Sequence, residues 1–554
     1  MTRRIIMSML TGATLLASTL LGASPAQAAG VPAQTAGLPA QAAHVPAEFG
    51  TDWHDPVTAA PPVTRPDTRS CEVTVAEAQF RDFTPYQGTY APPKECGDRW
   101  SKVVLRLDGK VKGRQYDRLG HLRFGGVEIL RTSTPQPSPD GIEWSVEKDV
   151  TRYSPTLRSP QPVEMLIGNV VDDTYTGIID VKVTLTFYTT RTHTAEKPTP
   201  PPADTPDRIL TLTDGTTLTT PRNSERIVAE VYATGSGGGC EEYWYLTVPG
   251  SAPYSCQADN GPYREVQIKV DGQLAGIAAP FPTVWTGGWS NPFLWYVVPG
   301  PRAFDIKPIE YDLTPFAGLL NDGRPHHVEV SVVGLPEGRP GWSTPVNVLV
   351  WQDDKRERVT GDLTVHRAGD LANSSAYTPG SQHRVDTEGA HRLTVAGYVD
   401  TSHGRVTTTI SRSLTNSSVH RWTDGETTDS LDAAWTDTET ITIEGRGPAK
   451  TTRAHRTYTM DGTTTLGAAD RLRTVLTLGD RATVVESRGG HRTAWSRLDD
   501  TYTGDATYTI NVPRDQRHAV GTTSERYRLY GSTGCHDHSL TAVQGVLTED
   551  RHRC

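Results

Sequence analysis

Apolar residues that alternate with polar ones are the feature that most limits what this chain can fold into. The segment "VVLRL" places Val103, Leu105 and Leu107 on one face, and "VKVTLTFY" repeats the pattern from residue 181 to residue 188. This period of two is typical of half-buried β-strands. Long apolar faces of helical period do not occur, whereas Gly (51) and Pro (40) are frequent. We therefore expect an all-β protein with many turns.

The chain is too long for one hydrophobic core, because 554 residues usually divide into several domains. In "REVQIKVDGQLAG" an alternating run meets Asp271-Gly272, a pair typical of a β-hairpin turn. Composition shifts give the other boundaries. The expected parts are a signal peptide (1–28), a disordered linker (29–65), a first β domain (66–195), a Pro-rich linker (196–207), a second β domain (208–350) and a C-terminal β-rich region (351–554).

The N-terminus has the pattern of a secretory signal. Arg3 and Arg4 precede an apolar stretch that ends in Ala26-Gln27-Ala28, so we expect cleavage near Ala28 and an extracellular protein. The apolar stretch is too short for a good membrane anchor, and we expect no membrane partner. The net charge of -9 and the lack of a basic block argue against a nucleic-acid partner. We expect a monomer.

Six cysteines in a secreted chain predict disulfides, because the compartment is oxidising. Six cysteines allow fifteen pairings. Short separations along the chain favour Cys71–Cys96, Cys240–Cys256 and Cys535–Cys554. The cysteines and histidines do not follow the spacing of a zinc site. We therefore expect neither a metal nor an organic cofactor.

Several carboxylates stand beside aromatic residues. In "GSGGGCEEYWY" two adjacent glutamates lie between a glycine run and three aromatics, in "GRQYDRLG" an aspartate follows a tyrosine, and in "EWSVEKD" a glutamate follows a tryptophan. Each of these acids, taken alone, is much more typical of an ordinary solvent-exposed or paired charge than of a catalytic group. The sequence has neither a G-x-S-x-G elbow nor a Walker loop. Hydrolysis by carboxylates is the chemistry that remains.

Longer segments resemble the plant-type peptide N-glycosidase A family. They include "AEVYATGSGGGCEEYWY", "GPYREVQIKVDGQLAGIAAPFPTVWTGG" and "YDRLGHLRFGGVEILRTSTPQPSPDGIEWSVEKDVTRY", and the similarity extends from about Cys71 to Val350. Family members hydrolyse the amide that joins the first N-acetylglucosamine to asparagine. The peptide N-glycosidase F type is a more distant likeness. It implies two jelly-roll-like antiparallel β-sandwiches with the site at their interface, and N-linked glycopeptides or glycoproteins as substrates.

Three local patterns are similar to those of the F type, namely Tyr116-Asp117-Arg118, Glu147-Lys148-Asp149-Val150-Thr151 and Cys240-Glu241-Glu242-Tyr243. The resemblance implies that Asp117, Glu147 and Glu242 share one site as catalytic acids. It departs from the F type where Tyr116 replaces a tryptophan. Trp244 is equally expected in the core, because tryptophan is mostly buried. The residues expected to bind substrate are Arg118, Tyr116, Trp144, Glu241, Tyr243, Trp244, Trp285 and Trp289.

The implied reaction is attack of water on the amide carbonyl. Asp117 would activate the water or take part directly at the carbonyl. A protonated neighbour, Glu242 or Glu147, would hold the sugar and assist the leaving nitrogen, and Arg118 would stabilise the oxyanion. Crowded acids separate each other's pKa values, so that one keeps its proton. Two alternatives remain open at this point. One is an endoglycosidase, which needs two carboxylates about 5–9.5 Å apart, and the other is a glycan-binding protein without activity.

Overall fold

The computed structural model describes residues 44–192, 204–235, 239–284, 291–336 and 341–554. The expected signal peptide (1–28) and parts of both expected linkers lie outside the described residues. The strands pair in antiparallel sheets, which confirms the expected all-β class. The helices α1 (Ser154–Leu157) and α2 (Ala317–Leu320) are single turns. Within the described ranges, no helix is long and apolar enough to cross a membrane.

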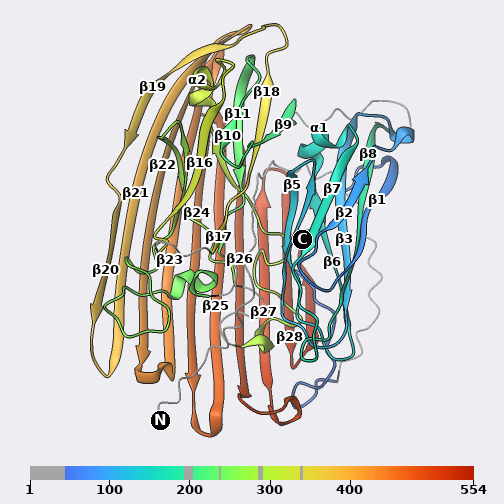
Figure 1. Cartoon of the computed structure of the whole chain (residues 1–554), viewed down its shortest axis with the longest axis vertical. Helices are drawn as coiled ribbons and strands as arrows, with labels where there is room; N and C mark the ends of the chain where they lie inside the picture. The colour runs from blue at the N-terminus through green and yellow to red at the C-terminus, as the bar shows by residue number, and fades with distance from the viewer. Residues whose placement is uncertain (1–43, 193–203, 236–238, 285–290, 337–340) are drawn as a thin grey trace.

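The first eight strands form a sandwich of two four-stranded sheets, with the orders β1-β8-β3-β6 and β2-β7-β4-β5 (Figure 1). This order is that of a jelly roll. Val103, Leu105 and Leu107 are fully buried, as their alternation predicts. The strands are β1 (Thr68–Phe80), β2 (Tyr86–Tyr90), β3 (Trp100–Val111), β4 (Leu119–Phe124), β5 (Val127–Ser133), β6 (Ile142–Asp149), β7 (Gln161–Ile167) and β8 (Ile179–Thr192).

A second sandwich repeats the same connectivity. Its sheets have the orders β15-β11-β18-β9 and β10-β16-β13-β14. When the eight strands are numbered in chain order starting from β9, these are again the strand orders of a jelly roll. The predicted hairpin joins β13 and β14 through Asp271 (φ 47°) and Gly272 (φ 78°), the left-handed pair that such a turn requires. The strands are β9 (Arg208–Thr211), β10 (Thr217–Leu218), β11 (Ser224–Val231), β13 (Glu265–Val270), β14 (Gln273–Ala278), β15 (Ile309–Asp312), β16 (His326–Val333) and β18 (Val346–Gln352), and a separate pair is formed by β12 (Thr234–Gly235) and β17 (Trp342–Ser343).

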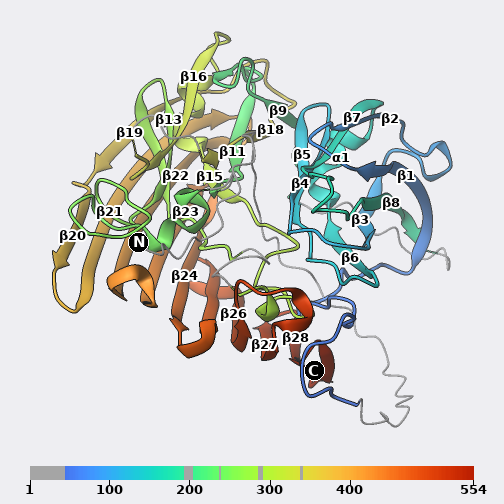
Figure 2. The same cartoon turned by 60° about the horizontal axis from the view of Figure 1, so that its bottom comes forward.

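The C-terminal region is one eleven-stranded antiparallel sheet, in which consecutive strands from β21 to β29 are neighbours and both β19 and β20 pair with β21. Figures 1 and 2 show that it curves around the second jelly roll. Arg302 joins the two by donating to Asp480 at 2.6 and 2.8 Å. The strands are β19 (Thr360–Ala368), β20 (Ala372–Thr378), β21 (Gln382–Thr401), β22 (Gly404–Thr423), β23 (Thr428–Gly445), β24 (Gly447–Leu466), β25 (Arg471–Arg488), β26 (His491–Thr509), β27 (Val520–Gly531), β28 (Gly534–Val543) and β29 (Val546–His552).

Residues 44–65 correct one expectation, because this part of the expected disordered linker packs against the C-terminal sheet. The ring of Trp53 stacks on Tyr296 with centroids 4.0 Å apart, and the backbone N–H of Ala59 donates to Glu525 at 3.1 Å. The composition is rich in Ala and Pro, which favours disorder. One buried tryptophan and several backbone hydrogen bonds offset that tendency.

The three predicted disulfides are confirmed. Cys71 is bonded to Cys96, Cys240 to Cys256 and Cys535 to Cys554. Each bond closes a loop of 16 to 25 residues, so pairing by proximity along the chain gave the right partners.

We predict that the stability of the C-terminal sheet falls as the pH rises from about 5 to 8. Burial raises the pKa of Glu525 from 4.5 to about 7, and burial beside Glu525 raises that of Asp500. A carboxyl whose pKa is higher in the folded state binds more protons there. The stabilisation that such a carboxyl provides is complete at a pH below its pKa in the unfolded chain. It is lost as the pH rises through its pKa in the folded protein.

The measurement is the melting temperature against pH. Glu525→Gln should have a shallower slope than the wild type, because the titrating group is gone. Asp505→Asn is the matched control, since Asp505 is an exposed partner of Arg473 on the same sheet. Equal slopes in Glu525→Gln and the wild type would contradict the assignment.

Candidate active site

Asp117 lies in the loop between β3 and β4, and its neighbours hold that loop rigidly. Gln115 donates from Nε2 to the carbonyls of Val170 (2.9 Å) and Gly177 (3.1 Å), which ties the loop to the body of the jelly roll. The Oε1 atom of Gln115 accepts from Arg118 Nε at 3.2 Å and Nη2 at 2.5 Å. The backbone N–H of Arg118 donates to Thr134 Oγ1 at 2.9 Å. Both sides of Asp117 are therefore fixed.

Glu242 lies on the second jelly roll, in a 3₁₀ segment (Cys240–Leu246) that follows the glycine run. Gly239 adopts φ 118°, which is strained for any other residue. Gly235 lies so close to this segment that a Cβ atom there would meet the Glu241 carbonyl oxygen at 2.2 Å. Glycine is thus needed at the first and last positions of the run, 235 and 239. The Cys240–Cys256 bond fixes the start of the 3₁₀ segment.

The two adjacent glutamates have different surroundings. Glu241 points into the protein, with an exposed fraction of 6%. Its carboxylate accepts two hydrogen bonds from the buried Arg264, at 2.6 and 3.0 Å, and a third from Trp342 Nε1 at 2.7 Å. This bidentate, charge-assisted pairing anchors the loop. The expectation that Glu241 binds substrate therefore conflicts with its buried contacts.

Asp117 and Glu242 lie in one cluster, although they come from different jelly rolls. Burial lowers the pKa of Arg118, and the negative charges of Asp117 and Glu242 both oppose that shift. Burial raises the pKa of Tyr243 well above its usual range, and the same two acids raise it further. The Tyr243 hydroxyl donates to Glu242 Oε1 at 3.4 Å. Both acids are therefore near enough to Arg118 and Tyr243 to act on them, which places the four side chains in the same region.

Tyr116 lies at the border of this cluster and is 36% exposed. Its ring contacts Tyr175 with centroids 5.2 Å apart, and Arg114 lies over the ring of Tyr175 at 5.4 Å. Tyr116 is also close enough to influence the pKa values of Tyr296 and Tyr508, which come from the second jelly roll and from β26. Aromatic rings from three parts of the chain therefore lie in the neighbourhood of Tyr116.

Glu147 has a different set of partners. Its carboxylate accepts from Arg65 at 2.5 Å and from Arg106 at 3.2 Å, and it pairs across the strands with Arg106. Along β6 it alternates with Trp144 and Val146, which are buried, so Glu147 projects from the opposite face of the sheet. The resemblance implies that three acids share one site. In the structure Asp117 and Glu242 lie in the same region, whereas the charged contacts of Glu147 are with two arginines.

The predicted tryptophans fall into two groups. Trp144 packs against Gly109 in the core of the first jelly roll, where an added Cβ atom would lie 2.4 Å from its ring. Trp244 is buried between Trp342 and Trp435, with centroids 6.1 and 5.5 Å away. Both residues are thus packing residues, in contrast to the expected contact with substrate. Trp285 and Trp289 lie outside the described residues.

Residues 59–369 match the family model of the peptide N-acetyl-β-D-glucosaminyl asparaginase amidase A proteins, which is more than half of the chain. The chain belongs to this family. The matched residues cover both jelly rolls and end just after β19, so most of the C-terminal sheet lies beyond the part that defines the amidase A family.

A curated relative supports this membership. The peptide-N4-(N-acetyl-beta-glucosaminyl)asparagine amidase A of Prunus dulcis is 30% identical over 385 residues, which are 63% of this chain and 66% of the relative. The chain thus spans just under two thirds of that protein. Among solved structures, PNGase F of Flavobacterium meningosepticum is 13% identical, with 51% of this chain and 96% of that chain covered and a TM-score of 0.33. The structure of PNGF-II is 14% identical, with 51% of this chain and 66% of that chain covered and a TM-score of 0.34.

Buried charges join the two jelly rolls of this amidase A member, and our sequence analysis did not single them out. Lys148 on β6 pairs with Asp305 at 3.4 Å, and burial lowers the pKa of the Lys148 ammonium group. Arg152 pairs with Glu230 at 3.5 Å and also contacts Glu310, whose pKa is raised by burial to about 7. One signal was available in the sequence. Lys148 occupies an inward position of the alternating strand, two residues after Val146.

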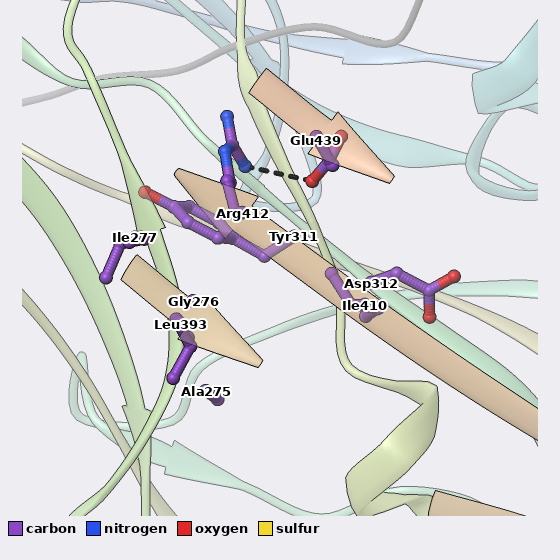
Figure 3. Close-up of a pocket in the computed structure, with 9 residues that line it drawn as sticks. All are labelled: Ala275, Gly276, Ile277, Tyr311, Asp312, Leu393, Ile410, Arg412 and Glu439. Carbon is purple, nitrogen blue, oxygen red and sulfur yellow. Dashed lines mark hydrogen bonds and ion pairs between the residues drawn. The ribbon is translucent and has the colours of Figure 1, made fainter. Parts of the chain in front are cut away.

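Figure 3 shows a small pocket at the junction of the second jelly roll and the C-terminal sheet, away from the residues predicted for the site. Arg412, which lines the pocket, donates to its cross-strand partner Glu439 at 3.2 Å. Gly276 lies directly beside the ring of Tyr311, where an added Cβ atom would come within 2.2 Å. We interpret this pocket as a gap in the packing between layers. Its lining is Ala275, Gly276, Ile277, Tyr311, Asp312, Leu393, Ile410, Arg412 and Glu439.

Replacing Glu241 should destabilise the protein much more than replacing Glu242. Glu241→Ala leaves Arg264 buried without its counter-charge, which costs about 3–5 kcal/mol when one partner of a buried pair is removed. The check is thermal unfolding of Glu241→Ala beside Glu242→Ala, its sequence neighbour and matched control. A Glu242→Ala protein that melts as low as Glu241→Ala would show that the two side chains do not differ in this way.

Proposed function

We propose that this chain is a glycoamidase that hydrolyses the amide between the innermost N-acetylglucosamine and the asparagine of N-linked glycopeptides or glycoproteins. The observation that carries the proposal is the meeting of Asp117 and Glu242 around Arg118 and Tyr243 at the junction of the two jelly rolls. All four residues belong to the part of the chain that matches the amidase A family. The name of the Prunus dulcis relative describes an amidase of this kind.

In the proposed reaction, water forms a bond to the amide carbonyl carbon and the carbon–nitrogen bond then breaks. The Asp117 carboxylate takes the proton of the attacking water. Glu242 in its protonated form gives a proton to the leaving nitrogen. The products are an aspartate in the peptide and a glycosylamine on the glycan. An amide nitrogen leaves poorly unless it is protonated, so the reaction needs one ionised acid and one protonated acid.

Arg118 and Tyr243 are proposed to stabilise the charges that form in this reaction, whereas repulsion between the two acids keeps one of them protonated. Arg118 remains a cation despite its burial, because a guanidinium does not lose its proton in proteins. Its charge favours the ionised form of a nearby carboxylate and stabilises negative charge on the amide oxygen. Tyr243 keeps its proton, because its pKa is raised far above neutral pH. It can therefore donate a hydrogen bond to Glu242 throughout the reaction.

Tyr116 is proposed as the platform on which a sugar ring stacks, since it is an exposed aromatic residue next to Asp117. The role proposed for Glu147 is outside the chemical step, because its carboxylate neutralises Arg65 and Arg106. Trp285 and Trp289 remain predicted substrate contacts. We also propose that the protein is secreted, because three disulfides are typical of an oxidising compartment.

Asp117→Asn should abolish deglycosylation while the protein still folds. The substitution removes the proton acceptor and keeps the size of the side chain, so the melting temperature should stay near that of the wild type. The assay is mass spectrometry of a purified N-glycopeptide after incubation. A glycoamidase leaves aspartate at the former asparagine and a peptide without sugar. An endoglycosidase leaves one N-acetylglucosamine on the asparagine, and a glycan-binding protein leaves the glycopeptide intact.

Glu147→Gln is the comparison variant for this experiment, because it is an acid that the site resemblance implicates and whose contacts lie elsewhere. Its activity should stay within about tenfold of the wild type, equivalent to about 1.4 kcal/mol of barrier. Activity of Asp117→Asn within that same range would refute the role of Asp117. A loss in Glu147→Gln as large as that in Asp117→Asn would place Glu147 in the reaction.

A further inference from the structure

The last two strands of the C-terminal sheet carry a cluster of metal-binding side chains. His538 on β28 and His552 on β29 are direct cross-strand partners, and Asp550 precedes His552 by two residues on the same face of β29. The Nε2 atom of His538 lies 2.8 Å from Asp550 Oδ1, and that of His552 lies 3.7 Å from the same oxygen. One ligand atom of each residue lies within 4.8 Å of the other two.

We propose that His538, Asp550 and His552 bind one divalent transition-metal ion, with Zn²⁺ as the best match. Two imidazole nitrogens and one carboxylate oxygen are ligands that zinc prefers. In a tetrahedral site with bonds of about 2.0–2.2 Å, the ligand atoms are separated by about 3.3–3.6 Å. The separations of 2.8 and 3.7 Å at Asp550 Oδ1 bracket this range. A shift of about half an ångström brings the shorter separation into this range, and water takes the fourth position.

A simple ion pair explains this arrangement less well. Asp550 Oδ1 is within hydrogen-bond distance of His538 only, because 3.7 Å to His552 is too long. The two imidazoles nevertheless stack face to face, with centroids 3.7 Å apart and an interplanar angle of 20°. Two protonated rings at this distance would repel each other. In the proposed site both rings are neutral and turn out of this stack, so that one nitrogen of each binds the ion together with the carboxylate.

The surroundings hold the three ligands in place without the metal. The Cys535–Cys554 disulfide ties β28 to the chain two residues beyond the end of β29 and so limits sliding of the two strands. Arg553, next to His552, donates to Ser539 Oγ at 2.5 Å and to Asp537 Oδ1 at 3.3 Å. These contacts link the two strands on the residues that flank the ligands. A preformed site loses less conformational entropy when the ion binds.

A second group of potential ligands, Glu225, Asp353 and His403, is less suited to a metal. The Asp353 carboxylate accepts backbone N–H groups from Ser402 at 2.5 Å and from Lys355 at 3.1 Å, so it already caps a loop. This group therefore supplies the control. The proposed ion would hold β29, the last strand of the sheet, which has a neighbour on one side only. Edge strands are the part of a sheet that most needs such protection.

The experiment is isothermal titration of the metal-free, untagged full-length protein with ZnCl₂. The expected result is one ion bound per chain, together with a rise in the melting temperature when zinc is present. His552→Ala should weaken binding by at least about tenfold, and folding should survive because His552 is 61% exposed. His403→Ala should bind zinc as the wild type does. Co²⁺ should give the visible absorption of a low-coordinate site in the wild type and not in His552→Ala.

Two results would overturn the proposal. One is the absence of saturable binding by the wild type up to about 1 mM zinc. The other is unchanged binding in His552→Ala. The test does not depend on the proposed glycoamidase activity, because the cluster contains none of the residues assigned to that reaction.

Discussion

The buried ion pairs between the two jelly rolls are the interaction on which the geometry of the site depends. Arg152 of the first jelly roll contacts Glu230 and Glu310 of the second, and Arg131 donates to Thr234 at 2.9 Å. Apolar surfaces alone tolerate sliding, whereas a buried charge that loses its partner costs several kcal/mol. The two sandwiches therefore have one favourable placement. Asp117 and Glu242 lie on loops of different sandwiches, and this placement brings them into the same region.

The glycine loop applies the same principle at a smaller scale. The loop that presents Glu242 must be held, and glycines have no side chains that could hold it. The neighbouring residue provides the anchor, since Glu241 is paired with Arg264 and Trp342 inside the protein. The Cys240–Cys256 bond adds a covalent tie one residue away. Two adjacent glutamates can thus have opposite surroundings, because neighbouring side chains of the segment point in different directions.

Local patterns predicted much of the fold. Alternation identified the buried strands around Val103 and Val183, the Asp271-Gly272 pair predicted its hairpin, and proximity along the chain gave all three disulfides. These features depend on residues close in sequence. The grouping of Asp117 with Glu242 was expected only through resemblance, because no local rule relates two loops 125 residues apart.

Residues 44–65 differ from expectation because tertiary contacts outweigh local preference. Residues 44–65 look disordered by composition, yet Trp53 finds a stacking partner in Tyr296 far along the chain. Glu147 lies in a motif that resembles a catalytic one, yet the strand's alternation turns it toward Arg106. That last point could have been predicted, because Trp144 and Val146 define the inward face of β6.

The most direct test of the account is a double-mutant cycle of kcat/KM on one N-glycopeptide, with Asp117→Asn, Glu242→Gln and the double variant. If the two acids act on the same bond as one unit, their effects are not additive. The account predicts that the double variant loses about as much activity as the more damaging single variant. Additive losses, in which the two barrier increases simply sum, would contradict the claim that the two jelly rolls build one catalytic site.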